Sequence, residues 1–301
     1  MTSITRPDWL EAFGDAIASG DSEGSVRALQ SQTTSHAGTA PAAEKRAAVK
    51  ETLARTQEEA LPGIALWFAR HERDLAKELG ALMLAKSYAR HPAEAITELR
   101  RLAADANWEV REWAGSATAN VFAAHFGELY PVMEDWLRDP SQFVRRAVAI
   151  ALMGASDRKH PERAKPLLAL ADTLVRDPAE EVKRNTGPFA VGNALLGKYP
   201  AETLEHVRAW ARTDEEIVRW NAAMVFVAAN ARKHVAAGLE ILSALAADKR
   251  RPVWMAVSSA AKNLAKRDPD STVPELRRWL LDERKLPASL ALRHVTIKEQ
   301  A

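Results

Sequence analysis

Two residues in the middle of the chain have the types and the spacing that chemistry on a bound molecule requires. Trp108 and Glu112 are four residues apart, so a helix places the indole and the carboxylate on one face, where both can act on one target. Glu112 stands where the next two repeats carry an arginine, and a carboxylate among basic residues is a local charge anomaly of the kind that often marks a reactive site. The alternative is a capping role, because acidic residues are favoured at helix N-termini.

Basic residues recur directly after a repeated valine. They are Arg111, Arg145, Arg146, Lys183, Arg184 and Arg219. A row of cationic side chains at one structural position is suited to a phosphate backbone, from which it releases condensed counterions. The alternative is that each arginine pairs with an aspartate of the neighbouring repeat and only stabilises the stack. The doubled residues are harder to explain in this way, since one such ion pair cannot use both side chains.

Tryptophans gather near the same positions. Trp108, Trp113 and Trp220 lie at the start of expected second helices, and Trp254 takes the position after the last repeated valine. An indole at the edge of a groove can stack on a base or contact a sugar. We expect Trp108 and Trp220 to be exposed, whereas Trp113 could equally contact a ligand or fill the core. Core packing is expected of Trp67, Trp136, Trp210 and Trp279.

The elements that position these residues repeat with a regular period. The repeated valines are spaced 34, 38, 36 and 35 residues apart, and a short gap separates each of them from an aspartate that precedes it. They are Val110, Val144, Val182, Val218 and Val253. A period in this range with helical patterning is typical of stacked helical hairpins. No segment has the alternating pattern of a strand. The sequence therefore predicts an all-α fold, a right-handed superhelical solenoid of HEAT-like helical repeats.

We expect one domain over residues 1–301. Its predicted parts are N-terminal helices over 1–62 with a polar loop near 31–41, repeats over 63–281 and a C-terminal tail over 282–301, of which the part after Pro287 is expected to pack as a cap. The individual helices are expected at 7–19, 42–56, 64–77, 78–90, 93–104 and 274–281. An aspartate precedes Pro140, Pro178 and Pro269, which predicts that the aspartate caps a helix and the proline is its first residue.

Composition excludes several classes of function. The chain has no cysteine, so it can form neither a disulfide nor a thiolate zinc site. Its eight histidines are scattered, and no metalloprotease, serine-hydrolase or phosphate-loop motif is present. No apolar run is long enough to span a membrane, and the first residues lack the pattern of a secretory signal. We therefore expect a cytoplasmic protein with no bound metal, cofactor or membrane.

The segment around Trp108 resembles the HEAT-like-repeat DNA glycosylases of bacterial alkylation repair. Trp108-Glu-Val-Arg-Glu112 matches the aromatic residue and the carboxylate that those enzymes carry four positions apart, and Phe143-Val-Arg-Arg146 places Arg146 as their catalytic-site arginine. One branch has a second tryptophan in the following repeat; here that ring is missing or is supplied by Phe189. The phrase from Arg176-Asp-Pro to Tyr199-Pro200 resembles another branch.

The resemblance implies a monomeric enzyme that binds double-stranded DNA in a basic concave groove. It would excise cationic N3- or N7-alkylated purines by hydrolysis of the N-glycosidic bond, without a metal or cofactor. Glu112 would stabilise the charge on the sugar, Trp108 would contact that sugar, and Arg146 would hold the adjacent phosphate. Further DNA contacts are expected from Arg111, Arg145, Lys183, Arg184, Arg219, Trp220 and Trp254, and lesion contacts from Trp113 and Phe189.

Two alternatives stay open at the level of the sequence. One is a relative that binds DNA without cleaving it, and the other is a scaffold for protein interactions, a common role of helical repeats. A scaffold predicts arginines that are neutralised by Asp105, Asp139, Asp177 and Asp214.

Overall fold

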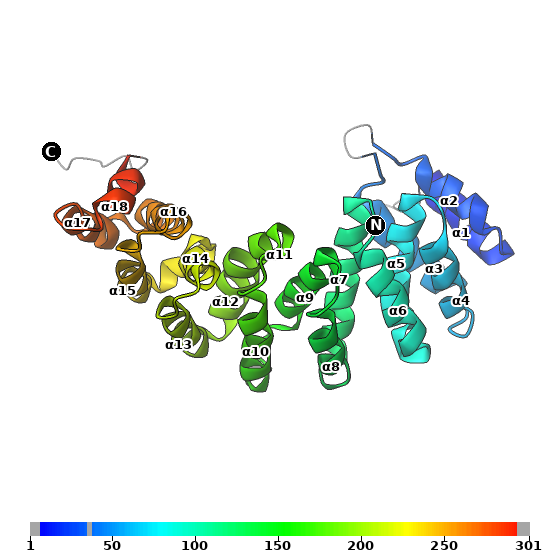
Figure 1. Ribbon diagram of the computed structural model, residues 1–301. Coiled ribbons are helices and arrows are strands. Elements are labelled where there is room, and N and C mark those ends of the chain that lie inside the picture. The colour runs from blue at the N-terminus through cyan, green and yellow to red at the C-terminus, as the bar shows by residue number, and fades with distance from the viewer. Residues whose placement is uncertain (1–6, 35–37, 294–301) are drawn as a thin grey trace. The chain divides into compact units, whose positions relative to one another are not determined.

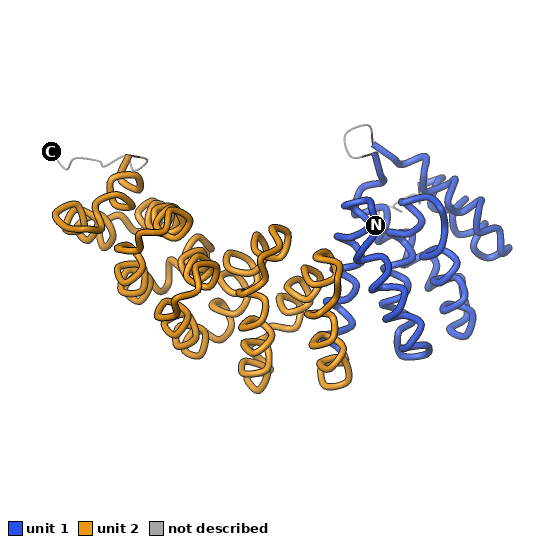
Figure 2. The backbone as a smooth tube through the Cα atoms, viewed as in Figure 1, with its two compact units in different colours: residues 1–124 blue, residues 125–301 orange. Residues whose placement is uncertain are grey.

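The computed structural model of the chain describes residues 7–34 and 38–293, and within these ranges every regular element is a helix (Figure 1). The predicted all-α fold is therefore confirmed. Internal contacts divide the chain into two compact units, residues 1–124 and 125–301 (Figure 2). The boundary falls inside the predicted repeat series of residues 63–281, and the single domain over 1–301 stays a prediction.

Unit 1 is built from antiparallel helix pairs. Its helices are α1 (Asp8–Ser19), α2 (Ser22–Gln30), α3 (Ala42–Arg55), α4 (Leu61–Arg70), α5 (Asp74–Ser87), the short 3₁₀ helix η1 (Tyr88–Arg90), α6 (Pro92–Ala103) and α7 (Trp108–Ala124). Helix α4 packs on α5 and α6 on α7, and from one pair to the next α4 contacts α6 and α5 contacts α7. Each pair thus buries its apolar face on the next, as stacked repeats require.

Unit 2 continues the same pattern of paired helices. Its elements are α8 (Phe126–Trp136), α9 (Gln142–Ala155), η2 (Pro161–Arg163), α10 (Ala164–Leu174), α11 (Glu180–Asn185), the π-helix η3 (Thr186–Leu195), α12 (Leu196–Lys198), α13 (Pro200–Ala211), α14 (Glu216–Met224), η4 (Val225–Val227), η5 (Ala229–Lys233), α15 (Val235–Ala246), α16 (Arg251–Arg267), α17 (Pro269–Trp279) and α18 (Lys285–Leu292). The first helices α10, α13, α15 and α17 form one layer, and the second helices α9, α11, α14, α16 and α18 form the other.

The repeated valines lie at the centre of this packing. Each sits in the first turns of a second helix, and none is more than 1% exposed; they are Val110, Val144, Val182, Val218 and Val253. A branched apolar side chain at this depth contributes about 1.5–3 kcal/mol by burial alone. The period read from the sequence therefore reports the true repeat of the fold.

Several predicted helix boundaries are wrong. The expected helices at 64–77 and 78–90 are α4 and α5, and each begins three or more residues earlier than predicted. The chain turns between them at residues 71–73, where the backbone N–H of Arg73 donates to Nδ1 of His71 at 3.0 Å. This turn contains neither glycine nor proline. Helix α2 was not predicted, and the expected helix at 274–281 begins at Pro269, with Pro274 inside it.

The role expected of the aspartate–proline pairs holds at one site of three. Asp268 accepts a hydrogen bond from the N–H of Ser271 and caps α17, with Pro269 as the first helical residue. Pro140 and Pro178 instead precede their helices by two residues. There the aspartates accept the N–H two residues further on, Asp139 from Ser141 and Asp177 from Ala179. These are Asx turns, which aim the chain into the helix without capping it.

The structure describes most of the predicted polar loop and part of the predicted C-terminal tail. Residues 31–34 and 38–41 are irregular, as expected of the polar loop, and residues 35–37 lie outside the described part. In the predicted tail, α18 packs on α16 and α17 with Ala288 and Ala291 buried; the tail as a separate part of the domain stays a prediction. None of the helices in the described ranges is long and apolar enough to cross a membrane.

Candidate functional site

The start of α7 is fixed by a polar network in unit 1. The side chain of Asn107 accepts the N–H of Glu109 at 2.8 Å, and Asp105 accepts the N–H of Asn107 at the same distance. Asn107 also donates to Asp74 at 2.7 Å, and Nζ of Lys77 lies 3.1 Å from both Asp74 and Asp105. Burial lowers the pKa of Lys77, but its hydrogen bonds to the two aspartates more than offset this, so that its pKa lies above the ordinary value.

This network presents Trp108 to solvent. Trp108 is the first residue of α7 and is 59% exposed, which confirms the expected exposure and is unusual for so large an apolar side chain. Glu112 lies one helical turn further on and is half-buried. The pair therefore shares the face that the spacing predicts, at the helix end where backbone N–H groups favour negative charge.

Behind this surface lies a buried ion pair that the sequence did not indicate. Lys45 of α3 and Glu78 of α5 are each 1% exposed and form an ion pair, and Thr39 donates to Glu78 at 2.9 Å. Burial raises the pKa of the Glu78 carboxyl above its usual range, although Lys45 and Thr39 both bind its charged form. Lys45 Nζ also lies 4.7 Å from the centre of the Trp113 ring. Trp113 is thus half-buried against the cationic side chains of α3.

Three arginines that follow repeated valines bind groups of the protein itself, and two of them reach an aspartate of the next repeat. Nη1 of Arg111 donates to the carbonyl groups of Asp105 and Ala106, both at 2.8 Å. Arg145 binds the carbonyl of Asp139 at 2.7 Å and both carboxylate oxygens of Asp177 in the next repeat, at 2.5 and 3.2 Å. The hydrogen bonds to Asp177 raise the pKa of Arg145.

Arg219 repeats the arrangement of Arg145 two junctions further along, between α14 and α16. It donates to the carbonyls of Ala211 and Thr213, and its Nε lies 2.7 Å from Asp248. The stack-stabilising alternative of the sequence analysis therefore applies to Arg145 and Arg219. The partner of Arg219 is Asp248, however, and not Asp214.

The remaining basic residues have other surroundings. Arg146 is half-buried in α9, with Nε 3.8 Å from Glu181. Lys183 lies with Nζ 4.2 Å from the centre of the Trp220 ring, a cation–π contact. Arg184 is exposed and pairs with Glu180 in its own helix at 2.9 Å. Such an exposed pair contributes little to stability and leaves the guanidinium accessible to an anion.

The repeat that carries Lys183 contains an irregular helix. Helix α11 ends at Asn185, and the π-helix η3 follows directly. Inside it Pro188 removes one N–H donor and crowds the preceding turn, which the wider π-turn accommodates. Asn221 accepts the N–H of Gly187 at 3.1 Å and donates to the carbonyls of Val175 and Ile217. A Cβ at Gly187 would lie 2.9 Å from Oδ1 of Asn221, so this approach requires glycine. Phe189, on the same π-helix, is 47% exposed.

The burial of the tryptophans agrees with the prediction for some of them and differs from it for others. Trp136, Trp210 and Trp279 are at most 2% exposed, as expected of core residues. Trp67 is half-buried and lines a surface hollow, so its assignment to the core is wrong. Trp220 is half-buried rather than exposed, and Lys183 lies on its ring. Trp254 is half-buried as well.

The candidate residues belong to separate parts of the chain. Trp108, Glu112, Arg111 and Trp113 lie in unit 1, and Arg146 lies in unit 2 with the other candidates. Lys183 and Trp220 are brought together, whereas a single site formed by Trp108, Glu112 and Arg146 stays a prediction. Within residues 7–34 and 38–293, no group of three or more histidine, aspartate or glutamate side chains is placed to hold a metal ion.

The fold and the residues on α7 define a class, the helical-repeat proteins, and comparisons place the chain within it. The structure of AlkD2 from Streptococcus mutans matches with a TM-score of 0.55 and 16% identity, covering 68% of this chain and 97% of that one. The smu.31 protein from Streptococcus mutans UA159 matches with a TM-score of 0.52 and 13% identity, covering 71% and 97%. At these identities the likeness concerns the fold alone. A comparison with curated protein sequences found no match.

The family match is more specific. Residues 22–189, more than half of the chain, match the family described as DNA alkylation repair enzyme. The chain belongs to the DNA alkylation repair enzyme family. The matched region contains α7 and α9, and it ends at Phe189 within the π-helix.

Proposed function

We propose that this protein is a DNA glycosylase that binds duplex DNA and hydrolyses the N-glycosidic bond of cationic N3- or N7-alkylated purines. Membership of the DNA alkylation repair enzyme family supports a DNA substrate. The observation that carries the proposal is the pairing of an exposed Trp108 with Glu112 one turn later on α7. A ring and a carboxylate on one accessible face are the two groups that a sugar with developing positive charge requires.

The reaction needs little from the protein beyond this pair. A water oxygen bonds to the sugar C1′, and the electron pair of the C1′–N bond passes to the base, which loses its positive charge and leaves. The positive charge that develops on the sugar is stabilised by the carboxylate of Glu112, which also accepts the proton of the water. Trp108 contacts the sugar through its exposed ring. Arg146 as the contact to the adjacent phosphate follows from the resemblance alone.

The structure refines which residues are best suited to bind DNA in this proposal. Arg111, Arg145 and Arg219 already bind backbone carbonyls, and the last two also pair with aspartates, so a phosphate would have to compete with these groups. Lys183 and Arg184 sit in one helical turn and are close in sequence to the exposed Phe189, and Lys183 lies on the ring of Trp220. We therefore place the main phosphate contacts of unit 2 at Lys183 and Arg184 of α11, with the rings of Phe189, Trp220 and Trp254 as contacts to bases or sugars.

A glycosylase assay tests the chemistry directly. Duplex oligonucleotides with a single N7-methylguanine or N3-methyladenine are incubated with wild type, Glu112→Gln and Glu109→Gln, and free base is measured by chromatography. We expect Glu112→Gln to lower release by at least about 100-fold, the size of effect seen when a charge-stabilising group is removed, while duplex binding is kept. Glu109→Gln is the matched control from the same helical turn and should release base like wild type. Equal release by wild type and Glu112→Gln would mean that the assigned chemistry is wrong.

A second candidate is a helical-repeat protein that binds DNA, or another protein, without cleaving a bond. The ion pairs of Arg145 with Asp177 and of Arg219 with Asp248 favour it, because they neutralise part of the expected basic row. In the same assay, salt-sensitive duplex binding without base release supports the DNA-binding form. Neither release nor binding supports the protein scaffold.

A further inference from the structure

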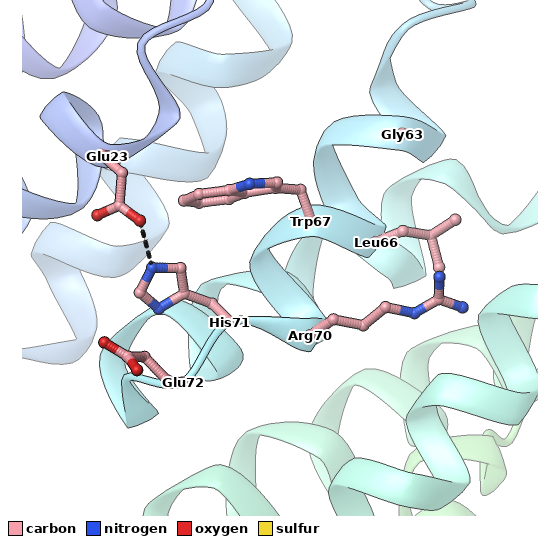
Figure 3. Close-up of a pocket in the computed structure, with 7 residues that line it drawn as sticks. All are labelled: Glu23, Gly63, Leu66, Trp67, Arg70, His71 and Glu72. Carbon is pink, nitrogen blue, oxygen red and sulfur yellow. Dashed lines mark hydrogen bonds and ion pairs between the residues drawn. The ribbon is translucent and has the colours of Figure 1, made fainter.

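A hollow of about 640 Å³ opens on unit 1, lined by Glu23 of α2 and by residues of α4 and the turn that follows it (Figure 3). Trp67 is half-buried and forms one wall. The carboxylates of Glu23 and Glu72 lie on the same side as its ring, and Arg70 extends the other way. Nε of Arg70 is held by Glu98 at 2.7 Å. The hollow thus combines an aromatic ring with two carboxylates.

The histidine in this hollow is held by two hydrogen bonds and orients one of the carboxylates. Nδ1 of His71 accepts the backbone N–H of Arg73 at 3.0 Å, so this nitrogen carries no proton. Nε2 therefore carries the proton and donates to Glu23 at 2.9 Å. This hydrogen bond holds the carboxylate of Glu23 in place beside the ring of Trp67. The His71 ring, 4.8 Å from that of Trp67, also orients the indole.

Gly63 lines the hollow at a point where a Cβ would meet open space. It lies in α4, where glycine weakens a helix relative to alanine. Neither a positive φ nor a close approach requires glycine here, because a Cβ at this position would meet no atom within 4 Å. A long side chain at position 63 would therefore extend into this open space, whereas an alanine would leave it free.

A second place in unit 1 combines a tryptophan ring with a carboxylate, and there a lysine of the chain itself lies between them. Lys45 lies between the carboxylate of Glu78 and the ring of Trp113. The hollow repeats the ring and the carboxylate with Trp67, Glu23 and Glu72, but at the surface. Ammonium and guanidinium groups are attracted both by the face of an indole and by carboxylates.

We propose that this hollow binds a lysine or arginine side chain of a partner polypeptide. A small free cation would stay largely hydrated here, because the side chain of Glu23 is 53% exposed. A polypeptide that covers the hollow removes that water and strengthens both attractions. The volume has room for one long cationic side chain together with its neighbours. The interaction is independent of DNA hydrolysis and does not rest on the proposed glycosylase activity.

Calorimetric titration of the full chain with a tetra-arginine peptide, in the absence of DNA, tests the proposal. We expect binding that weakens at least tenfold in Trp67→Ala, in Glu23→Gln/Glu72→Gln and in Gly63→Leu, whose side chain fills the hollow. Gly63→Ala, and Glu58→Gln/Glu59→Gln at two glutamates on the surface of unit 1, are the matched controls and should stay within twofold of wild type. Circular dichroism establishes that each variant is folded.

Three results would overturn the proposal. The first is no heat of binding with wild type. The second is binding that the hollow variants and the control variants change equally, which would place the peptide on another acidic surface. The third is Trp67-dependent binding of a short single-stranded oligonucleotide in place of the peptide, which would make the hollow a base-stacking site.

Discussion

Two junctions of unit 2, where the second helix of one repeat packs on the second helix of the next, differ in structure although both carry a valine followed by a basic residue. Between α9 and α11 the residue after the repeated valine, Arg145, reaches the aspartate of the next repeat. Between α11 and α14 the corresponding residue, Lys183, lies on the ring of Trp220, and the junction is tied by the uncharged amide of Asn221. The same valine–cation phrase therefore serves the stack in one repeat and leaves a cation near the surface in the next.

The difference teaches how to read basic residues in a repeat protein. An arginine whose guanidinium spans a carbonyl of its own repeat and a carboxylate of the next is a structural clamp, because its planar fork matches both acceptors. A lysine at the same position has a single ammonium group, which here lies over an aromatic face. Candidate DNA contacts are best sought where such a clamp has been replaced.

The largest effect that separates the two junctions is expected from Arg145→Ala. This change leaves Asp177, whose side chain is 10% exposed, without its guanidinium partner. We expect a loss of about 3 kcal/mol in the free energy of unfolding, the lower end for a broken buried ion pair, measured by urea denaturation. Arg184→Ala removes only an exposed pair within one helix and should change stability by about 0.5 kcal/mol or less. Equal losses in the two variants would show that Arg145 is not a clamp.

The next largest effect on the free energy of unfolding is expected from replacing Asn221. Asn221→Ala leaves the buried N–H of Gly187 and the carbonyl of Val175 without their partner. Unsatisfied buried groups cost about 1–3 kcal/mol, so we expect a loss of about 2 kcal/mol that is the same at low and high salt. The Arg145→Ala loss should shrink at high salt, since its origin is ionic. A strongly salt-dependent loss in Asn221→Ala would contradict the distinction between the junctions.

A smaller effect should appear on acidification at the junction of Arg219 and Asp248. The hydrogen bond from Arg250 and the charges of Arg250 and Arg219 hold the pKa of Asp248 below its ordinary value of 3.8, although burial opposes this. The stability that Asp248 contributes is therefore present above that value and is lost as pH falls through the lower pKa of the folded state. Urea midpoints measured between about pH 6 and pH 3 should fall less steeply in Asp248→Asn than in wild type. Asp214→Asn, at an exposed aspartate, should leave the slope unchanged.

Lys183→Met should have the smallest effect on the free energy of unfolding. It should have a clear effect on the binding of duplex DNA. It keeps an apolar stem against Trp220 and removes the charge, so the free energy of unfolding should change by about 1 kcal/mol or less. If Lys183 contacts a phosphate, the slope of log affinity for duplex DNA against log salt should fall by about 1. An unchanged slope in Lys183→Met, with a reduced slope in Arg145→Ala, would reverse the assignment of the two junctions.

Much of this architecture could be predicted from the sequence because it depends on local periodicity. The repeated valines are all buried, and Trp108 is exposed at the first residue of its helix. What the sequence did not indicate depends on contacts over long separations. The π-helix is held by Asn221, 34 residues from Gly187, and no local pattern encodes that contact. The turn after α4 is set by the side chain of His71, so the expected glycine or proline signal is missing.

In the candidate site, too, the features set by local spacing could be predicted, and those set by contacts between distant residues could not. The four-residue spacing of Trp108 and Glu112 was sufficient to place them on one helical face. It could not indicate that Lys45 and Glu78 lie buried behind α7, since a helix with so many charged residues is indistinguishable in sequence from a solvated one. Nor could it separate clamps from free cations, because the carboxylate that Arg145 binds belongs to a different repeat.

The alternation of clamps also determines how unit 2 responds to ionic strength. Repeats that touch only their neighbours behave as a chain of coupled links, whose strength is set junction by junction. The links on either side of α11–α14 are ionic and weaken as salt rises, whereas the amide link of Asn221 does not. At high ionic strength the two ionic links should therefore lose strength relative to the amide link of Asn221, and the junctions of Arg145 and Arg219 should open more readily than they do at low salt.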